Sequence, residues 1–142
     1  MLFTSPHFLV TTFFSGLLAF MLGMIWYHPA VMGRKWLKAR GMEGQDMKPT
    51  PLPFVVSFML WLVAATFFSF LAAVLNVTSA PGYLCLASLL WVGFAMPPTL
   101  MGALYTGYPM EAMSIDSSYQ LAGYYLLGVT HIVAAYLRVH VL

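Results

Sequence analysis

The polar side chains that could carry chemistry are concentrated in one otherwise apolar stretch near the end of the chain. Steps of three or four residues along the chain connect five polar residues, and this spacing places side chains on one face of an α-helix. The five are Asp116, Tyr119, Gln120, Thr130 and His131. At about 1.5 Å of rise per residue, Asp116 and His131 would lie roughly 22 Å apart along that helix. They cannot act as a catalytic pair, so we expect them in two separate layers of the protein.

The layer around Asp116 is the first candidate site. An ionisable side chain within a membrane helix is costly and by default faces the interior of the helix bundle. We predict that Asp116 forms an ion pair or hydrogen bond with one of three side chains of the first loop: His28, Arg34 or Lys35. Such a contact would be a structural clamp, and a proton-relay or substrate-binding role is the alternative.

The same layer could instead line a cavity for a small hydrophobic or amphiphilic ligand, such as a lipid, quinone or pigment. Aromatic rings would form its walls and the carboxylate of Asp116 would fix the orientation of the ligand. With the residue of the second layer included, the candidate ligand-binding residues are Trp26, Tyr27, Trp91, Asp116, Tyr119 and His131.

The second layer contains His131, with Gly128 three residues before it and Ala135 four residues after it. A histidine flanked by small residues can ligate the metal of a tetrapyrrole through one ring nitrogen. The alternative is a hydrogen bond to a hydroxyl from another helix. Candidates for that partner are Thr11, Thr12 and Ser88.

Enzyme signatures are not found in the sequence. It contains no nucleophile–base pair, phosphate-binding loop, CxxC or HExxH motif, and Cys85 is the single cysteine, which excludes disulfide frameworks and thiolate metal clusters. We therefore predict no catalytic residue, no metal site, no cofactor and no enzymatic activity. Nucleic acid is not an expected partner, because the net charge is only +2.

Composition identifies the solvent that these residues face. Of the 142 residues, 61% are hydrophobic and only 7% are charged, whereas soluble domains carry about 25% charged residues. A chain with so few charges cannot cover its surface in water, so we expect lipid around it. We predict an all-α protein in which residues 1–142 form a single integral membrane domain.

Four apolar stretches are long enough to cross a bilayer, which takes about 20 residues each. We predict transmembrane helices at about 8–27, 52–75, 83–105 and 115–138. The last helix could begin at Ser117, which starts a Ser-x-x-Gln capping box, or near Pro109, where proline suits a first turn. We favour the earlier start. Pro97–Pro98 should kink the third helix, and the freed carbonyls of Gly93 and Phe94 could alternatively line an ion or substrate site.

Small residues recur every four positions in the first two of these helices. The two series are Ser15, Ala19 and Gly23, and Ala65, Ser69 and Ala73. This spacing allows another helix backbone to approach closely. We expect these faces to pack within the chain or against a partner.

The loop at 28–51 carries most of the positive charge. We expect a short amphipathic helix there, with Met32, Trp36 and Leu37 on one side. It should lie on anionic lipid, which attracts each basic residue by about 1 kcal/mol. Its basic residues are Arg34, Lys35, Lys38 and Arg40.

Orientation follows from the distribution of lysine and arginine, which remain on the cytoplasmic side of a membrane. Five of the six basic residues lie in the loop at 28–51 and one lies near the C-terminus. We therefore expect this loop inside the cell, both termini outside, and a location in the bacterial cytoplasmic membrane.

A family resemblance supports the same architecture. The sequence resembles the domain of unknown function 1761 family, small and mostly bacterial membrane proteins for which the resemblance implies four helices and no known activity. The match runs from the first helix to Gly128. It rests on four motifs: Gly23-x-x-Trp26-Tyr27-x-Pro29, Gly33-Arg34-Lys35-Trp36 with Gly41, Trp91-x-Gly93-Phe94, and Ile115-Asp116-Ser117-Ser118-Tyr119.

The chain departs from the family pattern at three positions. His28 replaces a serine, Asp116 an asparagine, and Ser118 a glycine. A family role that needs an amide at position 116 would therefore not transfer to this chain.

Three functions fit these observations. The first is a non-catalytic accessory or structural subunit that packs against a larger membrane complex or against itself. The second is a binder or carrier of a small hydrophobic or amphiphilic ligand, and the third and weakest is an enzyme acting on lipid. We favour the first.

Overall fold

Helices form every regular element in the part of the chain that the structure describes, residues 5–45 and 50–140 of a computed structural model. Helix α1, Pro6–Trp26, begins where the Ser5 side chain accepts a hydrogen bond from the Phe8 amide. It ends at Trp26, three positions before Pro29. The π-helical turn η1, Pro29–Gly33, and the short helix α2, Arg34–Ala39, follow. The expected amphipathic helix is therefore present, although its first turn is wider than an α-helix.

Helix α3, Pro51–Val74, returns along α1. A short turn leads to α4, Ala80–Leu90, which the Ser79 side chain caps. The π-helical segment η2, Trp91–Ala95, and α5, Met96–Thr106, continue α4 without a break and form one rod of 27 residues. The last helix, α6, spans Met110–His140.

These bounds confirm the early start of the last helix and show that a start at Ser117 is wrong. Ser117 lies within α6, where a helix that begins at Met110 needs no cap. A kink was expected at Pro97–Pro98. The structure instead has the π-helical segment η2 just before the prolines, and the rod continues through it. Gly93 and Phe94 are exposed, so their carbonyls line none of the cavities described below.

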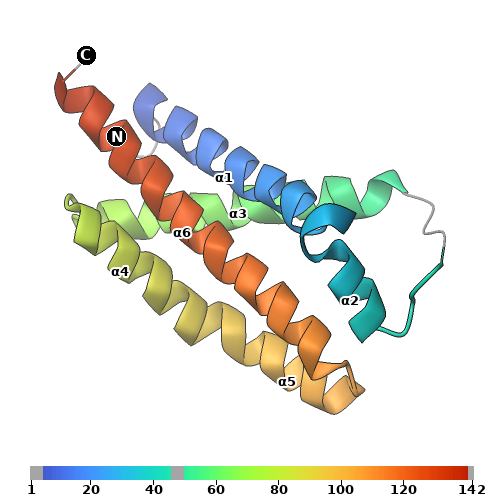
Figure 1. Ribbon diagram of the computed structural model, residues 1–142. Coiled ribbons are helices and arrows are strands. Elements are labelled where there is room, and N and C mark those ends of the chain that lie inside the picture. The colour runs from blue at the N-terminus through green and yellow to red at the C-terminus, as the bar shows by residue number, and fades with distance from the viewer. Residues whose placement is uncertain (1–4, 46–49, 141–142) are drawn as a thin grey trace.

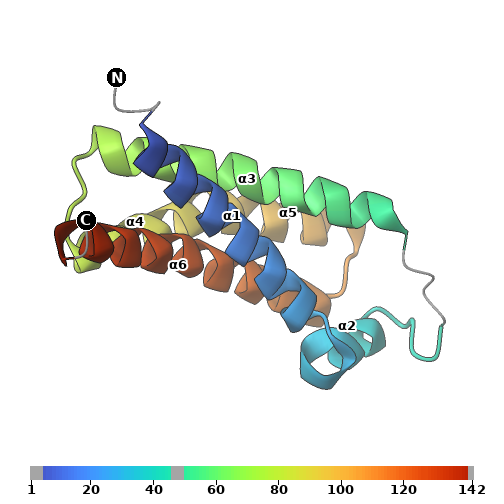
Figure 2. The same cartoon turned by 90° about the horizontal axis from the view of Figure 1, so that it is seen from above.

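Helix α6 is the centre of the arrangement. It contacts α1, α2, α4 and α5, and it lies between α1 and the α4–α5 rod in Figure 1. Figure 2 shows α3 running beside α1, and α2 at one end of the bundle. Both termini lie at the other end. The two ends of the bundle therefore differ in composition, because only one of them carries the basic loop.

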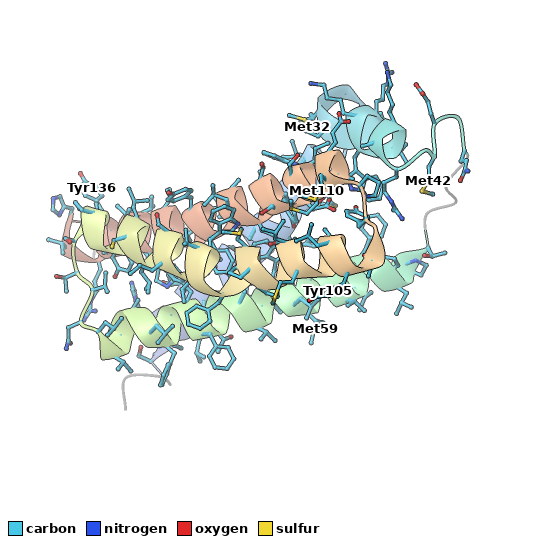
Figure 3. All side chains as sticks on the ribbon, turned by 90° about the horizontal axis from the view of Figure 1, so that it is seen from below. Met32, Met42, Met59, Tyr105, Met110 and Tyr136 are labelled. Atoms are coloured by element: carbon cyan, nitrogen blue, oxygen red, sulfur yellow. The ribbon has the colours of Figure 1, made fainter. Side chains whose placement is uncertain are left out.

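Three helical stretches, Pro6–Trp26, Pro51–Val74 and Ala80–Thr106, are long and apolar enough to cross a membrane. Many of their large side chains face outward, with exposed fractions of 63% at Phe67 and 74% at Phe94. Figure 3 shows side chains projecting outward along the whole bundle, with Met32 and Met42 at one end and Tyr136 at the other. An apolar surface of this extent is typical of a protein that lies in lipid. Helix α6 does not have the same uniform apolarity, because its first third carries Glu111, Asp116 and several hydroxyls.

Small residues allow the helices to approach one another. Ser15, Ala19 and Ala65 are completely buried, and Ser69 is nearly so. The expected small-residue faces therefore pack within the chain. Gly123 of α6 lies against the Trp61 indole so closely that a methyl group at this position would overlap the ring.

We predict that Gly123→Ala lowers the free energy of unfolding by about 1–3 kcal/mol, because the indole ring or the helix must shift. Gly102→Ala is the matched control, since open space surrounds Gly102 in α5, and an exposed helical alanine should change stability by about 1 kcal/mol or less in the favourable direction. Thermal unfolding of both variants in the same detergent measures the difference. Equal stability of the two variants would contradict the proposed contact.

Candidate functional site

Asp116 lies in the second turn of α6, and each of its carboxylate oxygens accepts one tyrosine hydroxyl. Tyr27, at the end of α1, donates to Oδ1 at 2.6 Å, and Tyr108, in the loop before α6, donates to Oδ2 at 2.7 Å. Hydrogen bonds to a charged acceptor are the strong ones in proteins, worth about 1.5–3 kcal/mol each. Asp116 therefore joins the end of α1 to the start of α6 and to the loop that precedes it.

The predicted partners of Asp116 were wrong: its carboxylate reaches the first loop indirectly, through the ring contact between Tyr27 and Trp36. Asp116 makes no ion pair within residues 5–45 and 50–140, and Arg34 and Lys35 are exposed on α2. His28 is used differently, because its Nδ1 accepts the Ala30 amide at 3.2 Å and caps η1. The basic side chains of α2 are exposed, and neutral phenols reach the carboxylate.

Aromatic rings connect this contact to α2. The Tyr27 ring packs edge-on against Trp36, with ring centroids 5.6 Å apart, and the Arg40 guanidinium lies 4.6 Å from the centre of the Trp36 ring. Arg40 also lies 5.7 Å from the centre of the Tyr108 ring. We refer to Tyr27, Trp36, Arg40, Tyr108 and Asp116 together as the clamp.

Burial and the hydrogen bond to Asp116 raise the pKa of the Tyr108 hydroxyl to about 12. The same two causes, in the same order, raise the pKa of Tyr27 above its ordinary value. Both phenols therefore keep their protons at physiological pH and remain hydrogen-bond donors to the carboxylate. The arrangement holds a negative charge in place without a basic side chain.

A second polar contact lies one turn farther along α6. The Trp61 indole of α3 donates to the Tyr119 hydroxyl, which itself donates to the Ala19 carbonyl of α1 at 3.3 Å. The Tyr119 ring lies against Gly23, where a methyl group would overlap it. Tyr119 therefore joins α1, α3 and α6 at one point.

The remaining tryptophans of the predicted site have separate roles. Trp91 donates from Nε1 to the Ser117 carbonyl at 3.1 Å and so joins the α4–α5 rod to α6. The Trp26 ring faces Tyr119 at 6.5 Å between centroids, and its Nε1 is buried with no hydrogen-bond partner in the part of the chain that the structure describes. Of these four residues, Tyr119 lines the cavity described next, and Trp26, Trp91 and Asp116 are not among its lining residues.

A cavity is present beside this layer, on the other side of Tyr27 and Tyr119. It has a volume of about 660 Å³ and opens between α1, α2 and the first turns of α3. Its wall is mostly apolar and includes Tyr27 and Trp36 of the clamp, together with Tyr119. The other lining residues are Phe20, Gly23, Met24, Pro29, Gly33, Leu37, Thr50, Pro53, Phe54 and Ser57.

Gly33 shapes one edge of this cavity. A methyl group on Gly33 would overlap the carbonyl of Tyr27, because the wide turn of η1 brings the chain back onto the end of α1. The Gly33 amide donates to the His28 carbonyl at 3.1 Å, which closes this turn. Only glycine therefore fits where the first loop folds over the end of α1.

The layer at the other end contains His131, which is buried. Its Nδ1 donates to the Leu127 carbonyl at 2.8 Å, because a carbonyl can only accept. Its Nε2 pairs with the Ser69 hydroxyl at 2.9 Å, and Thr12 donates to Ser69 at 2.8 Å. The predicted hydroxyl partner is therefore present in kind, but it is Ser69, and Thr12 contacts the histidine only through Ser69. Both ring nitrogens are engaged, so neither is free to ligate a tetrapyrrole metal in this arrangement.

Sequence reasoning missed three of the residues that make these contacts: Tyr108, Trp61 and Ser69. Tyr108 could have been found, because it precedes Pro109 at the start of the helix that carries Asp116. Trp61 and Ser69 gave no such signal, since their partners depend on how α3 is rotated against α6.

We predict that Asp116→Lys releases α2 from the bundle, because both tyrosine hydroxyls lose their acceptor and a second positive charge faces Arg40. Local opening of α2 should then become easier, so trypsin should cleave at the basic residues of Arg34–Arg40 at least about tenfold faster. Glu111→Lys makes the same charge change at an exposed position of the same helix and is the control. Mass spectrometry of the early fragments measures both rates, and equal rates would show that Asp116 does not hold α2.

Residues 10–132 match the family described as "Protein of unknown function (DUF1761)". Comparison with curated proteins and with solved structures finds no match.

Proposed function

Because the chain belongs to the DUF1761 family of proteins of unknown function, which supplies no activity to transfer, we propose a function from its own geometry. The proposed function is non-catalytic binding of an amphiphilic, lipid-like molecule in the cavity between α1, α2 and α3. One observation carries the proposal: the apolar cavity of about 660 Å³ beside an exposed cluster of positive charge.

The cavity has the size and lining expected for such a ligand. Ligand pockets generally measure about 300–1,000 Å³ and are lined by apolar and aromatic side chains with few polar groups. The lining hydroxyls of Tyr27 and Tyr119 are already engaged with Asp116 and Ala19, whereas Thr50 and Ser57 are exposed at the cavity. An apolar body would therefore enter without displacing the internal hydrogen bonds.

The head group of the ligand would meet α2. Trp36 and Leu37 line the cavity, while Arg34, Lys35 and Lys38 on the same helix are exposed. This combination suits a molecule with an apolar tail and an anionic head. Anionic lipids at a membrane surface have this chemistry, and each basic residue near the surface contributes about 1 kcal/mol to their attraction.

An accessory or structural subunit is the second candidate. The observation that favours it is the broad apolar surface of α3 and the α4–α5 rod, which could contact a partner protein or lipid alike. The small-residue faces no longer support it, because they are buried within the chain.

To test the first candidate, Ser57→Trp would fill the cavity from its α3 wall. We expect native mass spectrometry in gentle detergent to show an amphiphile retained by the unmodified protein and at least about tenfold less of it on this variant. Val63→Trp adds the same ring to an outward position of α3 and should retain the ligand. Equal retention by both variants, or none by the unmodified protein, would refute the binding role, and a stoichiometric partner protein would instead favour the accessory subunit.

We also propose that α6 is a fourth membrane span and that the basic loop is cytoplasmic. The 31 residues of α6 give a helix of about 46 Å, and its Asp116, Tyr119 and His131 side chains bind partners within the bundle. The excess of lysine and arginine in the first loop supports the orientation, with both termini outside, in a bacterial cytoplasmic membrane.

Cysteine labelling tests this orientation in a Cys85→Ser background. Glu43→Cys should react only with a reagent supplied from the cytoplasmic side, and Thr78→Cys and His140→Cys only from outside. Reaction at position 140 from the cytoplasmic side would contradict the fourth span, and reaction at position 43 from outside would reverse the orientation.

A further inference from the structure

A second cavity lies at the opposite end of the bundle from the clamp. It has a volume of about 520 Å³ and opens between the first turns of α1, the end of α3, the turn before α4 and the last turns of α6. This cavity is more polar than the first. Its lining includes His7, Thr11, Asn76, Thr78 and Arg138.

The charge around this cavity has one sign. Arg138 and His7 line it, and no acidic side chain among residues 5–45 and 50–140 does so. The acidic residues that the structure describes, Glu43, Glu111 and Asp116, follow α2 or lie at the start of α6, at the other end of the bundle (Figure 1). A cation without a nearby carboxylate leaves this cavity favourable to an anion.

A hydroxyl in the cavity wall points to the same conclusion. Thr11 is only 7% exposed, it lines the cavity, and no hydrogen bond joins its hydroxyl to any residue that the structure describes. Thr12 and Ser69 nearby are both hydrogen bonded. The Thr11 hydroxyl is therefore available to donate a hydrogen bond to an acceptor in the cavity.

We propose that this second cavity binds an anionic phosphate group, carried either by a soluble phosphomonoester or by the head group of an anionic phospholipid. The Arg138 guanidinium supplies the positive charge and Thr11 donates from the wall. Asn76 and Thr78 offer further donors at the rim. The N-terminal end of α1, whose first residues also line the cavity, adds a favourable dipole.

Two arms of one experiment distinguish the sources of the phosphate. In the first arm, calorimetry measures the binding of inorganic phosphate and of glycerol 3-phosphate to the full chain in a neutral detergent. In the second arm, native mass spectrometry measures lipid retained from phosphatidylcholine nanodiscs with and without phosphatidylglycerol. Binding in the first arm identifies a soluble ligand, and retention of phosphatidylglycerol alone identifies a head group.

Variants then locate the site in whichever arm shows binding. We expect Arg138→Gln to weaken binding at least about tenfold and Thr11→Val about three- to tenfold, as the loss of a charged and of a neutral hydrogen bond implies. His140→Gln is the matched control, because His140 lies at the same end but does not line the cavity. The proposal is overturned if neither arm shows binding, or if Arg138→Gln binds as tightly as His140→Gln.

Discussion

The carboxylate of Asp116 is the contact on which the basic end of the protein depends. An uncompensated charge within an apolar bundle would be costly, and this chain compensates it with two neutral phenols instead of an ion pair. Because Tyr27 ends α1 and Tyr108 precedes α6, satisfying one carboxylate also fixes the turn after α1 and the loop before α6. The position of α2 then follows, since Trp36 packs on Tyr27 and Arg40 on Trp36. The first cavity exists because α2 is held away from the start of α3.

A second constraint is that the most polar of the long helices occupies the centre. The outward surfaces of α1, α3 and the α4–α5 rod are apolar, whereas α6 directs Asp116, Tyr119 and His131 toward them. Each of these side chains finds partners on other helices, which satisfies the requirement that polar groups in a low-dielectric interior be hydrogen bonded. The three polar contacts are spaced along α6 and therefore also set its rotation against its neighbours.

Much of this architecture could be predicted from composition and periodicity, and the particular partners could not. The apolar runs and Pro29 predicted the ends of α1 and α3 to within about two residues. Both signals are local in the sequence, because bilayer thickness sets the length of an apolar run and proline ends a helix. The face of α6 that carries Asp116 and His131 was also correct. The partners of Asp116 and His131 were not predicted correctly. Whether Tyr27 and Ser69 reach these side chains depends on how the helices are rotated about their axes. The prediction that Asp116 pairs with Arg34 or Lys35 was wrong, because these charged side chains are exposed and do not enter the bundle.

The π-helical segment η2 has a consequence for the whole α4–α5 rod. At about 100° per residue, Thr99 would point roughly 120° away from Ala87 in an uninterrupted α-helix, but one residue absorbed by a wide turn reduces this to about 20°. Ala87 contacts Gly128, Trp91 binds the Ser117 carbonyl and Thr99 lies 3.2 Å from the Gln120 amide oxygen. The wide turn thus changes the angle at which the later side chains leave the helix axis. As a result, Ala87, Trp91 and Thr99 of the 27-residue rod all face α6. In this protein the prolines at 97 and 98 and the wide turn before them serve alignment along the bundle axis.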